Sequence, residues 1–449
     1  PSFEGRPFAT DASTFFGNPD VSYSKITANV FSALLEHRFS SRYTLRNRTS
    51  YGDYDKFYQN VFPGAVNAAG TEVSLSGYNN GMKRQNFFNQ TDLVVSAHTG
   101  GLAHTLLVGA ELGRQVSDNV RTTAFFTTIS PITTTVNAPV SDPVTSLPVE
   151  FRPSATDADN HGVATVAALY VQDQLVLSSH LQAVVGLRYD DFGMDFTNNR
   201  TASDLASDDG LVSPRVGLIY KPVVPVSVYA SYSLSYLPRA GEQLASLSLT
   251  NQALEPEEFR NYEIGAKWDL TPGLAFTAAG YQLDRSNVVA PDPTDPSRSI
   301  LVDGQRTKGV ELALGGNLTS TWSIVGGYAW QDGEITRSLS PTAQAGAVLA
   351  QLPKNSFSLW NRYDISPKWG AGIGVIYRSS VYTSTDNTVL MPGFTRVDAA
   401  VFFKLNAKLR AQLNVENLFD VDYYAYAHSN NNITPGSPLA VRFGITSRF

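Results

Sequence analysis

Apolar and polar side chains alternate along most of this chain. In the closing segment, nearly every second position holds a large apolar residue: Leu439, Val441, Phe443, Ile445 and Phe449. The positions between them include Arg442, Thr446 and Arg448. A period of two is that of a β-strand, whose successive side chains point to opposite faces. The segment therefore predicts a strand with one apolar face and one polar face.

Three internal segments repeat this pattern. In residues 409–416, Leu, Ala, Leu and Val alternate with Arg, Gln, Asn and Glu. In residues 369–377, large apolar residues alternate with glycines, and in residues 310–314 Val, Leu and Leu alternate with Glu and Ala. These segments predict strands of the same two-faced kind.

Short and long connections alternate between the predicted strands. The short ones contain turn-forming residues and predict hairpin turns: 40–41, 100–101, 178–180, 223–225, 271–273, 319–321, 366–368 and 406–408. The long ones are polar: 56–83, 118–161, 198–210, 239–258, 290–299, 334–353, 383–391 and 427–437. This order is that of a meander of roughly seventeen strands, with turns at one rim and loops at the other.

Such strands suit a wall with lipid outside and water inside. We therefore predict an all-β fold, a transmembrane antiparallel up-and-down β-barrel. A soluble antiparallel sandwich would give the same alternation, but not so many long strands with this asymmetry of connections. If Phe449 lies at the periplasmic rim, the short turns are periplasmic and the long loops extracellular. The first strand, near 23–39, is then expected to present an open sheet edge.

Composition narrows the function. The chain of 449 residues has no Cys, a mean hydropathy of −0.14 and a net charge of −6. It holds no run approaching the roughly 20 apolar residues of a transmembrane helix, which a barrel strand of about ten residues does not need. The charge gives no basic patch for nucleic acid, and the absence of Cys excludes disulfides and thiolate chemistry.

Enzyme signals are weak. The six His are scattered without ligand spacing, and no GxSxG, HExxH or P-loop pattern occurs. We therefore expect no enzyme, no catalytic residues and no protein-bound metal, with a barrel hydrolase as the alternative.

Several segments go beyond a generic barrel pattern. Residues 228–238 are VYASYSLSYLP, 254–268 are LEPEEFRNYEIGAKW, 309–314 are GVELAL and 414–424 are NVENLFDVDYY. In this order they resemble the C-terminal barrel of TonB-dependent outer-membrane receptors. Residues 51–64, YGDYDKFYQNVFPG, are similar to the ferric-siderophore branch of that family.

The resemblance implies a barrel of about 22 strands with an N-terminal plug domain inside it. No plug precedes the barrel here, so residues 1–449 are expected to be an N-terminally truncated barrel domain that starts inside an extracellular loop. The implied location is the outer membrane of a Gram-negative bacterium. Expected partners are outer-membrane lipid, the TonB complex through the missing plug, and the barrel-assembly machinery through Phe449.

The implied function is uptake of a ferric siderophore, energised through TonB, with iron carried only as a chelate and no other cofactor. A passive porin is the runner-up, since 16–18 strands is the porin range. A binding-only surface receptor or adhesin is a third possibility. The sequence leaves the siderophore type open, and haem or cobalamin as well.

A ferric siderophore already satisfies its metal, so the receptor needs aromatic faces and hydrogen-bond donors instead of metal ligands. The candidate contacts are aromatic or basic residues in loops and at upper strand ends: Phe15, Phe16, Tyr54, Tyr58, Phe125, Phe126, Tyr236, Arg239, Trp330, Tyr382, Tyr426 and His428. For each of them, packing within the loops or membrane interface is an open alternative.

Other marked residues are expected to be structural. The charged residues on the polar parity are expected to form charge pairs inside the lumen, with direct ligand contact as the alternative: Glu263, Lys267, Glu311, Arg410, Glu416 and Arg442. Asn414, Glu416 and Asn417 are expected to close the last hairpin. Trp322, Tyr363 and Trp369, near short turns, predict an interfacial aromatic girdle.

Overall fold

The computed structural model describes residues 1–240, 247–248, 252–291 and 299–448. Within these residues, no helix is long and apolar enough to cross a membrane. Seventeen long strands form the main sheet: β3 (Tyr23–Arg38), β4 (Tyr43–Val66), β5 (Glu72–Thr99), β6 (Leu102–Phe125), β9 (Asp159–Val176), β10 (Leu181–Asn198), β11 (Ser203–Val223), β12 (Val226–Leu237), β13 (Glu257–Thr271), β14 (Leu274–Ser286), β17 (Gln305–Asn317), β18 (Trp322–Ile335), β19 (Asn355–Asp364), β20 (Trp369–Arg378), β23 (Phe394–Lys404), β24 (Leu409–Glu416) and β27 (Ala440–Ser447).

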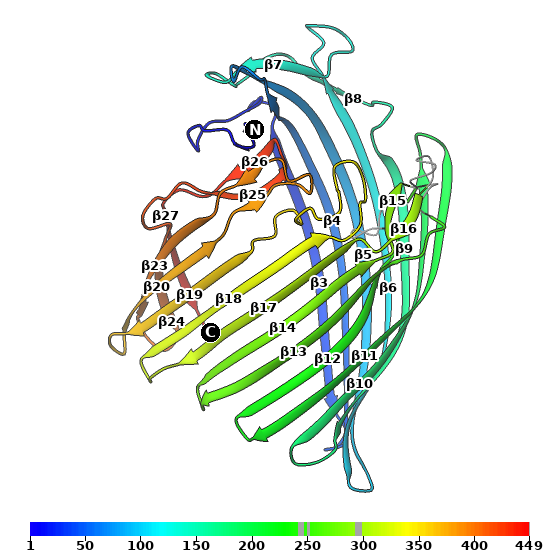
Figure 1. The fold of residues 1–449 in the computed structure, drawn as a ribbon, viewed down its shortest axis with the longest axis vertical. Helices are drawn as coiled ribbons and strands as arrows, with labels where there is room; N and C mark the ends of the chain where they lie inside the picture. Colours follow the sequence, from blue (N-terminus) through cyan, green and yellow to red (C-terminus); the bar gives the residue numbers. More distant parts are fainter. Residues whose placement is uncertain (241–246, 249–251, 292–298, 449) are drawn as a thin grey trace.

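Short strands decorate the loop rim of this sheet: β1 (Ser2–Phe3), β2 (Arg6–Pro7), β7 (Thr135–Pro139), β8 (Glu150–Arg152), β15 (Val288–Pro291), β16 (Ser299–Val302), β21 (Val381–Tyr382), β22 (Leu390–Met391), β25 (Tyr424–Ser429) and β26 (Asn432–Pro435). β7 and β8 extend the sheet beside β5 and β6, and the others form two-stranded ribbons. Figure 1 shows the long strands as one strongly curved wall with the ribbons at its upper end.

Each long strand pairs antiparallel with the next long strand along the chain, so the wall is an up-and-down meander. All eight predicted short turns join consecutive strands of the wall. For example, β3 ends at Arg38 and β4 begins at Tyr43, around the predicted turn 40–41. The predicted fold class and the strand number are thereby confirmed.

The long connections differ in extent from those that the sequence predicts: the predicted loops 383–391 and 427–437 lie within longer connections, 379–393 and 417–439, whereas the predicted loop 56–83 is much shorter. β4 continues to Val66 and β5 begins at Glu72, so most of the predicted loop 56–83 is paired strand. The ladder continues because its side chains still find an apolar core: Val61, Val73 and Leu75 are almost fully buried beneath the neighbouring loop. The predicted loops 239–258 and 290–299 lie partly outside the described residues.

The apolar parity faces the outside of the wall. In β27, Val441, Phe443 and Ile445 are 59%, 68% and 63% exposed. They therefore do not lie in a dry core between two sheets, which contradicts the sandwich alternative. The girdle residues Trp322 and Tyr363 are cross-strand partners on this outer face, close to the short turns.

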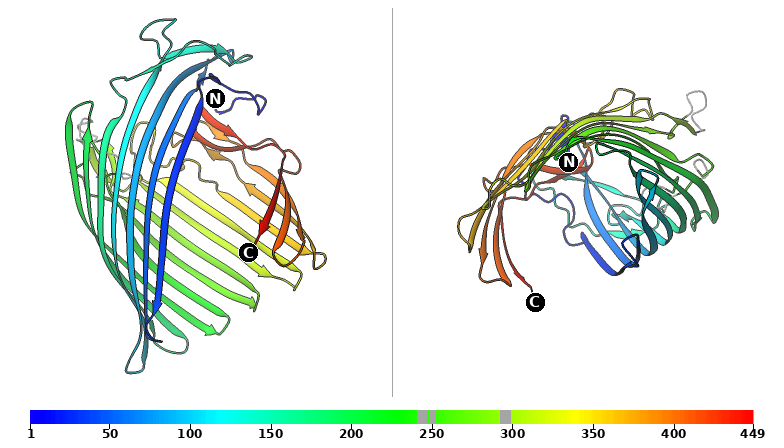
Figure 2. Two further views of the ribbon diagram at one scale, coloured as in Figure 1. Left: turned by 180° about the vertical axis from the view of Figure 1, so that it is seen from behind. Right: turned by 90° about the horizontal axis from the view of Figure 1, so that it is seen from below.

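The first and last long strands meet at a seam. β27 and β3 are neighbours in the order of the sheet, but their residue-by-residue pairs join β3 to β4 and β27 to β24. Every residue of β3 is exposed, as is nearly every residue of β27. Figure 2 shows the two strands standing apart. The exposed edge predicted near 23–39 is therefore found in β3.

Asn417 closes the last hairpin, as predicted. Its side chain is fully buried and adopts φ 53°, a left-handed conformation that Asn tolerates better than most residues. Its amide donates to the carbonyl oxygens of Val421 (3.0 Å) and Ser437 (3.1 Å) and accepts from the Val421 N–H (2.9 Å). The Asn417 N–H donates to Asp398 at 2.8 Å. Through its backbone N–H and its side chain, Asn417 thus joins β23, the turn after β24 and the segment that leads into β27.

Candidate ligand-binding rim and inner wall

Two of the predicted loop aromatics lie in the core of the loops. Phe126 is fully buried and packs with Val61, Val73 and Leu75. Phe16 packs against the same cluster from the segment before β3. That segment is held down by Gly17, whose N–H donates to the carbonyl of Pro143 and whose carbonyl accepts from the N–H of Thr145. The first loop and the long loop after β6 therefore form one packed unit.

A loop chamber of about 520 Å³ opens beside this unit. Phe15, which is 43% exposed, and Phe16 contribute aromatic surface from one side. Tyr423 and Tyr424 contribute it from the other side, near the start of β25. The chamber offers the aromatic faces that a bulky chelate needs, and it lies where the resemblance implies ligand capture.

The aromatic residues on β4 and β6 contact neighbouring polar groups. Tyr58 and Tyr78 meet edge to face, with their hydroxyl oxygens 3.4 Å apart. The Arg121 guanidinium lies 3.9 Å from the Tyr78 ring centre. Phe125 stacks in the same way beneath Arg152, at 4.0 Å. Tyr54 lies on the same strand as Tyr58, where Arg84 is its cross-strand partner.

Arg239 is buried and paired. Its guanidinium lies 3.5 Å from the Glu257 carboxylate and donates to the carbonyl of Asn287 at 2.6 Å. Burial lowers the pKa of the Arg239 guanidinium from its ordinary value, although Glu257 opposes that effect. These contacts tie the loop after β12 to β13 and to the end of β14.

The remaining candidates are spread around the rim. Trp330 lies near the upper end of β18, opposite Val310 of β17, and the carbonyl of Tyr382 accepts from the Gln351 N–H. Tyr426 and His428 are exposed on β25. The structure therefore brings Phe15 and Phe16 into one chamber, buries Phe126 and Arg239, and places the other candidates elsewhere on the rim and the inner wall. As ligand contacts, all twelve stay predictions.

A second cavity lies on the inner wall below the rim. It measures about 440 Å³ and is lined by Phe88, Phe192, Tyr236 and Arg188, among others. Tyr236 also borders an acidic cavity of about 410 Å³ that contains Asp208, Asp209, Glu255 and Glu258. Of these lumen residues, the sequence singled out Tyr236 alone.

Three residues that line this cavity belong to a network that we name the inner-wall cluster, which consists of Gln90, Asp92, Glu111, Tyr170, Arg188 and Asp190. Arg188 donates to Asp190 at 2.6 Å and to Glu111 at 3.2 Å. Tyr170 donates to Asp92 and accepts from Gln90 at 2.9 Å. The Arg188 guanidinium lies 5.4 Å from the Tyr170 ring centre.

The sequence contained a signal for this cluster. Arg188 and Asp190 are two residues apart on the polar parity of β10, where they alternate with Leu187 and Tyr189, which are exposed on the outer face. Their cross-strand partners could not be known without the register. The partners in the predicted charge pairs also depend on the register. Glu416 forms such a pair with Arg442, at 3.1 Å.

Two of the other polar-parity charges, Glu263 and Lys267, contact Tyr229. Glu263 accepts from the Tyr229 hydroxyl at 2.6 Å. The Lys267 ammonium lies 5.8 Å from the Tyr229 ring centre. In the part of the chain that the structure describes, no group of three or more His, Cys, Asp or Glu could hold a metal ion.

Comparison with known proteins identifies the family. The sequence model described as "TonB dependent receptor-like, beta-barrel" matches residues 2–418. The chain belongs to this family. The family is one of Gram-negative outer-membrane receptors and not of enzymes, and the chain is accordingly an outer-membrane protein.

Two curated relatives cover nearly the whole chain. The metal-pseudopaline receptor CntO of Pseudomonas aeruginosa is 28% identical over 97% of this chain and 61% of its own length. The probable TonB-dependent siderophore receptor PiuA of Acinetobacter baumannii is 28% identical over 98% of this chain and 64% of its own length. The chain thus spans less than two thirds of these relatives.

Solved structures show the same fold. The siderophore receptor PiuA from Acinetobacter baumannii superposes with a TM-score of 0.87 at 24% identity, covering 99% of this chain and 67% of that one. The closed form of the ferric-catecholate import receptor Fiu from E. coli K12 gives a TM-score of 0.84 at 24% identity, covering 97% of this chain and 66% of that one. Neither of these structures is a porin.

Proposed function

We propose that the protein containing this chain takes up a ferric siderophore across the outer membrane and is energised through TonB. The observation that carries this proposal is the match to receptors named for siderophores and metallophores over almost all of the chain. The wall supplies a rigid frame, because each long strand between β3 and β27 is paired with the strand before it and the strand after it. The outer membrane holds no ATP, so accumulation needs energy from the inner membrane through TonB.

The rim geometry supports capture of a bulky chelate. We propose that Phe15 and Phe16 contact it in the loop chamber, with Tyr54, Tyr58, Phe125, Tyr426 and His428 around the mouth as further contacts. Phe126 and Arg239, both buried, would support the loops that present those residues. Iron would be carried only inside the chelate, without a further cofactor.

We also propose roles for the rest of the receptor and for the lipid around it. Residues 1–449 would be the barrel portion of a longer receptor, whose plug would contact TonB. Outer-membrane lipid would cover the apolar outer face. Phe449, proposed as the contact for the barrel-assembly machinery, lies outside the described residues.

The test is uptake of iron-labelled chelates by cells that express the full-length gene, with and without TonB. We expect accumulation of at least one ferric siderophore that disappears without TonB. Equal uptake in both strains would reject the proposal and favour a passive pore. Binding without uptake in either strain would instead favour a surface receptor.

A further inference from the structure

Four polar residues interrupt the apolar outer face of the wall. We call them the polar square, which consists of two cross-strand pairs of β4 and β5 that are neighbours on one face: Asn47 with Thr91 and Thr49 with Asn89. The square faces outward, because its β5 members alternate along the strand with Gln90 and Asp92, which belong to the inner-wall cluster. It shares the outer face with the exposed rings of Tyr51 and Phe87.

The square lies within the apolar belt of the wall. The next pair above it on this face is Tyr51–Phe87, and the next pair below it is Leu45–Leu93. Small and apolar side chains flank it on β3 and β6: Ala33, Leu35, Ala110 and Leu112. Under the proposal that lipid covers this face, each polar group of the square is costly unless it is hydrogen-bonded.

The four side chains of the square bond to one another. The Asn47 amide donates to the Thr91 hydroxyl at 2.8 Å and to the Asn89 amide oxygen at 3.2 Å. The Asn89 amide donates to the Thr49 hydroxyl at 2.7 Å and to the Asn47 amide oxygen at 3.3 Å. The two hydroxyls donate back to the amide oxygens on their own strands, at 3.1 and 3.4 Å. Each amide thus uses two donors and two acceptor positions, which is its full capacity.

This closed network depends on the register of the two strands. A shift by one residue would turn the apolar parity of one strand to the lumen, so the alternation alone excludes it. A shift by two residues keeps every side chain on its face, and the alternation does not exclude it. In one direction such a shift would place Asn47 opposite Leu93 and Asn89 opposite Tyr51; in the other it would place Thr49 opposite an aromatic ring. Either shift breaks both Asn–Thr pairs.

The register of β4 and β5 also determines which residues meet at the rim. Above the square, Tyr58 meets Tyr78 edge to face, and Val61 packs with Val73 and Leu75 in the core of the loops. At about 3.3 Å per residue, a two-residue shift would displace these contacts by about 7 Å. The alignment of this part of the rim therefore depends on the register that is set within the belt.

We propose that the polar square fixes the register of β4 and β5 during assembly of the wall, and thereby aligns the rim residues that the two strands carry. Polar groups away from water specify an alignment when a single alignment satisfies them, as a lone Asn does in the core of a coiled coil. The proposal concerns the wall itself and holds whichever ligand the receptor takes up. Its test needs no uptake measurement, so the two proposals fail separately.

The register can be measured with disulfides, because residues 1–449 contain no Cys. Asp55→Cys, above the square, is combined in turn with Lys83→Cys, Gln85→Cys or Gly81→Cys. Lys83 is the direct partner of Asp55, and the other two residues report a shift by two in either direction. Direct partners have Cα atoms about 4.5–5.5 Å apart, within disulfide range, whereas diagonal neighbours are about 7–8 Å apart. The full-length receptor is oxidised mildly in outer membranes, and the linked peptides are quantified by mass spectrometry.

The test variant makes the square apolar with side chains of similar shape: Asn47→Leu, Thr49→Val, Asn89→Leu and Thr91→Val. The matched control exchanges Asn and Thr within each strand and so keeps one Asn and one Thr in each cross-strand pair: Asn47→Thr, Thr49→Asn, Asn89→Thr and Thr91→Asn. We expect the shifted disulfides to become about tenfold more frequent in the apolar variant than in the unaltered receptor. The control should give the native disulfide alone.

Two results would overturn the proposal: the native disulfide alone in the apolar variant, or shifted disulfides at the same level in the control. Thr197→Cys with Asp204→Cys, a direct pair of β10 and β11, reports whether the wall has assembled. If that disulfide is missing in the apolar variant, the milder variant Asn47→Leu/Asn89→Leu decides by the same measurement. A native register combined with loss of cross-linking between copies would assign the square to an interface and would also overturn the proposal.

Discussion

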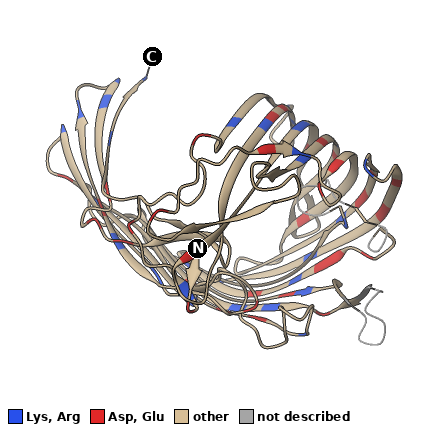
Figure 3. Cartoon of the chain, turned by 90° about the horizontal axis from the view of Figure 1, so that it is seen from above, with Lys and Arg blue, Asp and Glu red and all other residues tan. Residues whose placement is uncertain are grey.

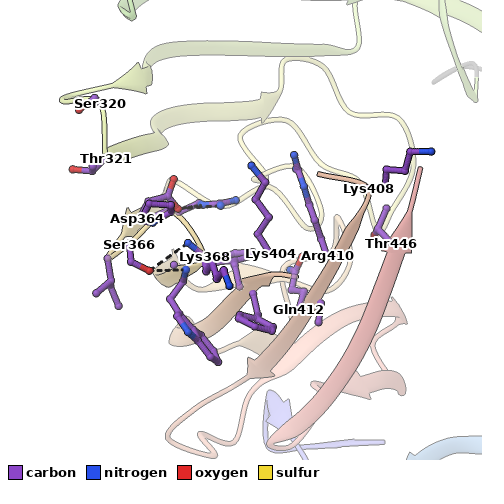
Figure 4. A pocket seen from close by; sticks show the side chains of 18 of the residues that line it. Ser320, Thr321, Asp364, Ser366, Lys368, Lys404, Lys408, Arg410, Gln412 and Thr446 are labelled. Carbon is purple, nitrogen blue, oxygen red and sulfur yellow. Dashed lines mark hydrogen bonds and ion pairs between the residues drawn. The ribbon is translucent and has the colours of Figure 1, made fainter. Parts of the chain in front are cut away.

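The inner-wall cluster and the basic rim pocket differ in how their charges are paired. The basic rim pocket is a cavity of about 790 Å³ at the turn rim, lined by Arg362, Lys368, Lys404, Lys408, Arg410 and Arg448 (Figure 4). In the cluster, Arg188 is matched by Asp190 and Glu111 within hydrogen-bonding distance. In the pocket, Lys404 and Arg410 are cross-strand partners, and neither forms an ion pair with an acidic side chain in the described part of the chain. Figure 3 shows the contrast, with red and blue interleaved along the wall but blue at the strand tips near the C-terminus. Paired charges stabilise the wall, whereas like charges on neighbouring strands repel one another.

The comparison can be tested by substitutions in the full-length receptor reconstituted in lipid vesicles, with urea unfolding as the measurement. The largest effect should come from a residue that holds the strands around the pocket in place. Asn417→Ala removes three side-chain hydrogen bonds from a fully buried site and puts Ala at φ 53°. We expect the free energy of unfolding to fall by about 3–4 kcal/mol. Asn414→Ala, on the adjacent β24, should cost far less, and equal losses would contradict the role of Asn417.

The next effect concerns the cluster. Arg188→Gln removes the cation shared by Asp190 and Glu111 and leaves two carboxylates close together. Because the side chains are partly exposed, water and salt will screen part of the loss. We expect a decrease of about 1–2 kcal/mol in the free energy of unfolding. Arg215→Gln on β11, at an exposed position without an ion pair among the described residues, is the matched control and should change little. A cost equal to that of the control would show that Arg188 is not structurally paired.

A smaller loss is expected at the other end of the cluster. Tyr170→Phe deletes the hydroxyl that joins Asp92 and Gln90 while keeping the ring beside Arg188. The expected change in the free energy of unfolding is about 1 kcal/mol. A double-mutant cycle with Asp92→Asn would measure the coupling, and additive losses would show that the two residues act independently.

The smallest effect on the free energy of unfolding is expected in the basic rim pocket. Lys404→Gln removes a cation from the pocket without breaking an ion pair in the described residues. We expect the free energy of unfolding to stay within about 0.5 kcal/mol or to rise slightly, since like-charge repulsion is relieved. A clear loss of stability would mean that Lys404 has a structural partner, and the contrast between the regions would then disappear.

The fold was accessible from the sequence because its signal is local. A period of two tells which residues of β24 and β27 face outward without knowledge of their neighbours. The short turns are equally local, since residues 271–273 and 366–368 carry their own turn formers. The extents of the loops were not accessible. Nothing local in 56–83 showed that Val61, Val73 and Leu75 would find a shared core and prolong β4 and β5.

The candidate sites were accessible only in part. Loop aromatics could be named from their positions, but whether an aromatic faces the mouth or the loop core depends on tertiary packing, as Phe15 and Phe126 show. The basic rim pocket escaped notice for a related reason. Arg410 was expected to form a charge pair, and only the register shows that its neighbour is Lys404.

The unequal strand lengths have a consequence for the mouth. At about 3.3 Å per residue, the 28 residues of β5 span about 90 Å, whereas the eight residues of β24 span about 26 Å. A bilayer core is only about 30 Å thick, so the β4–β6 side would rise as a tall screen, whereas β24 on the opposite side is too short to reach past the headgroups (Figure 1). The entrance is therefore slanted. A molecule diffusing over the cell surface meets an open approach on the low flank and a backstop on the high one.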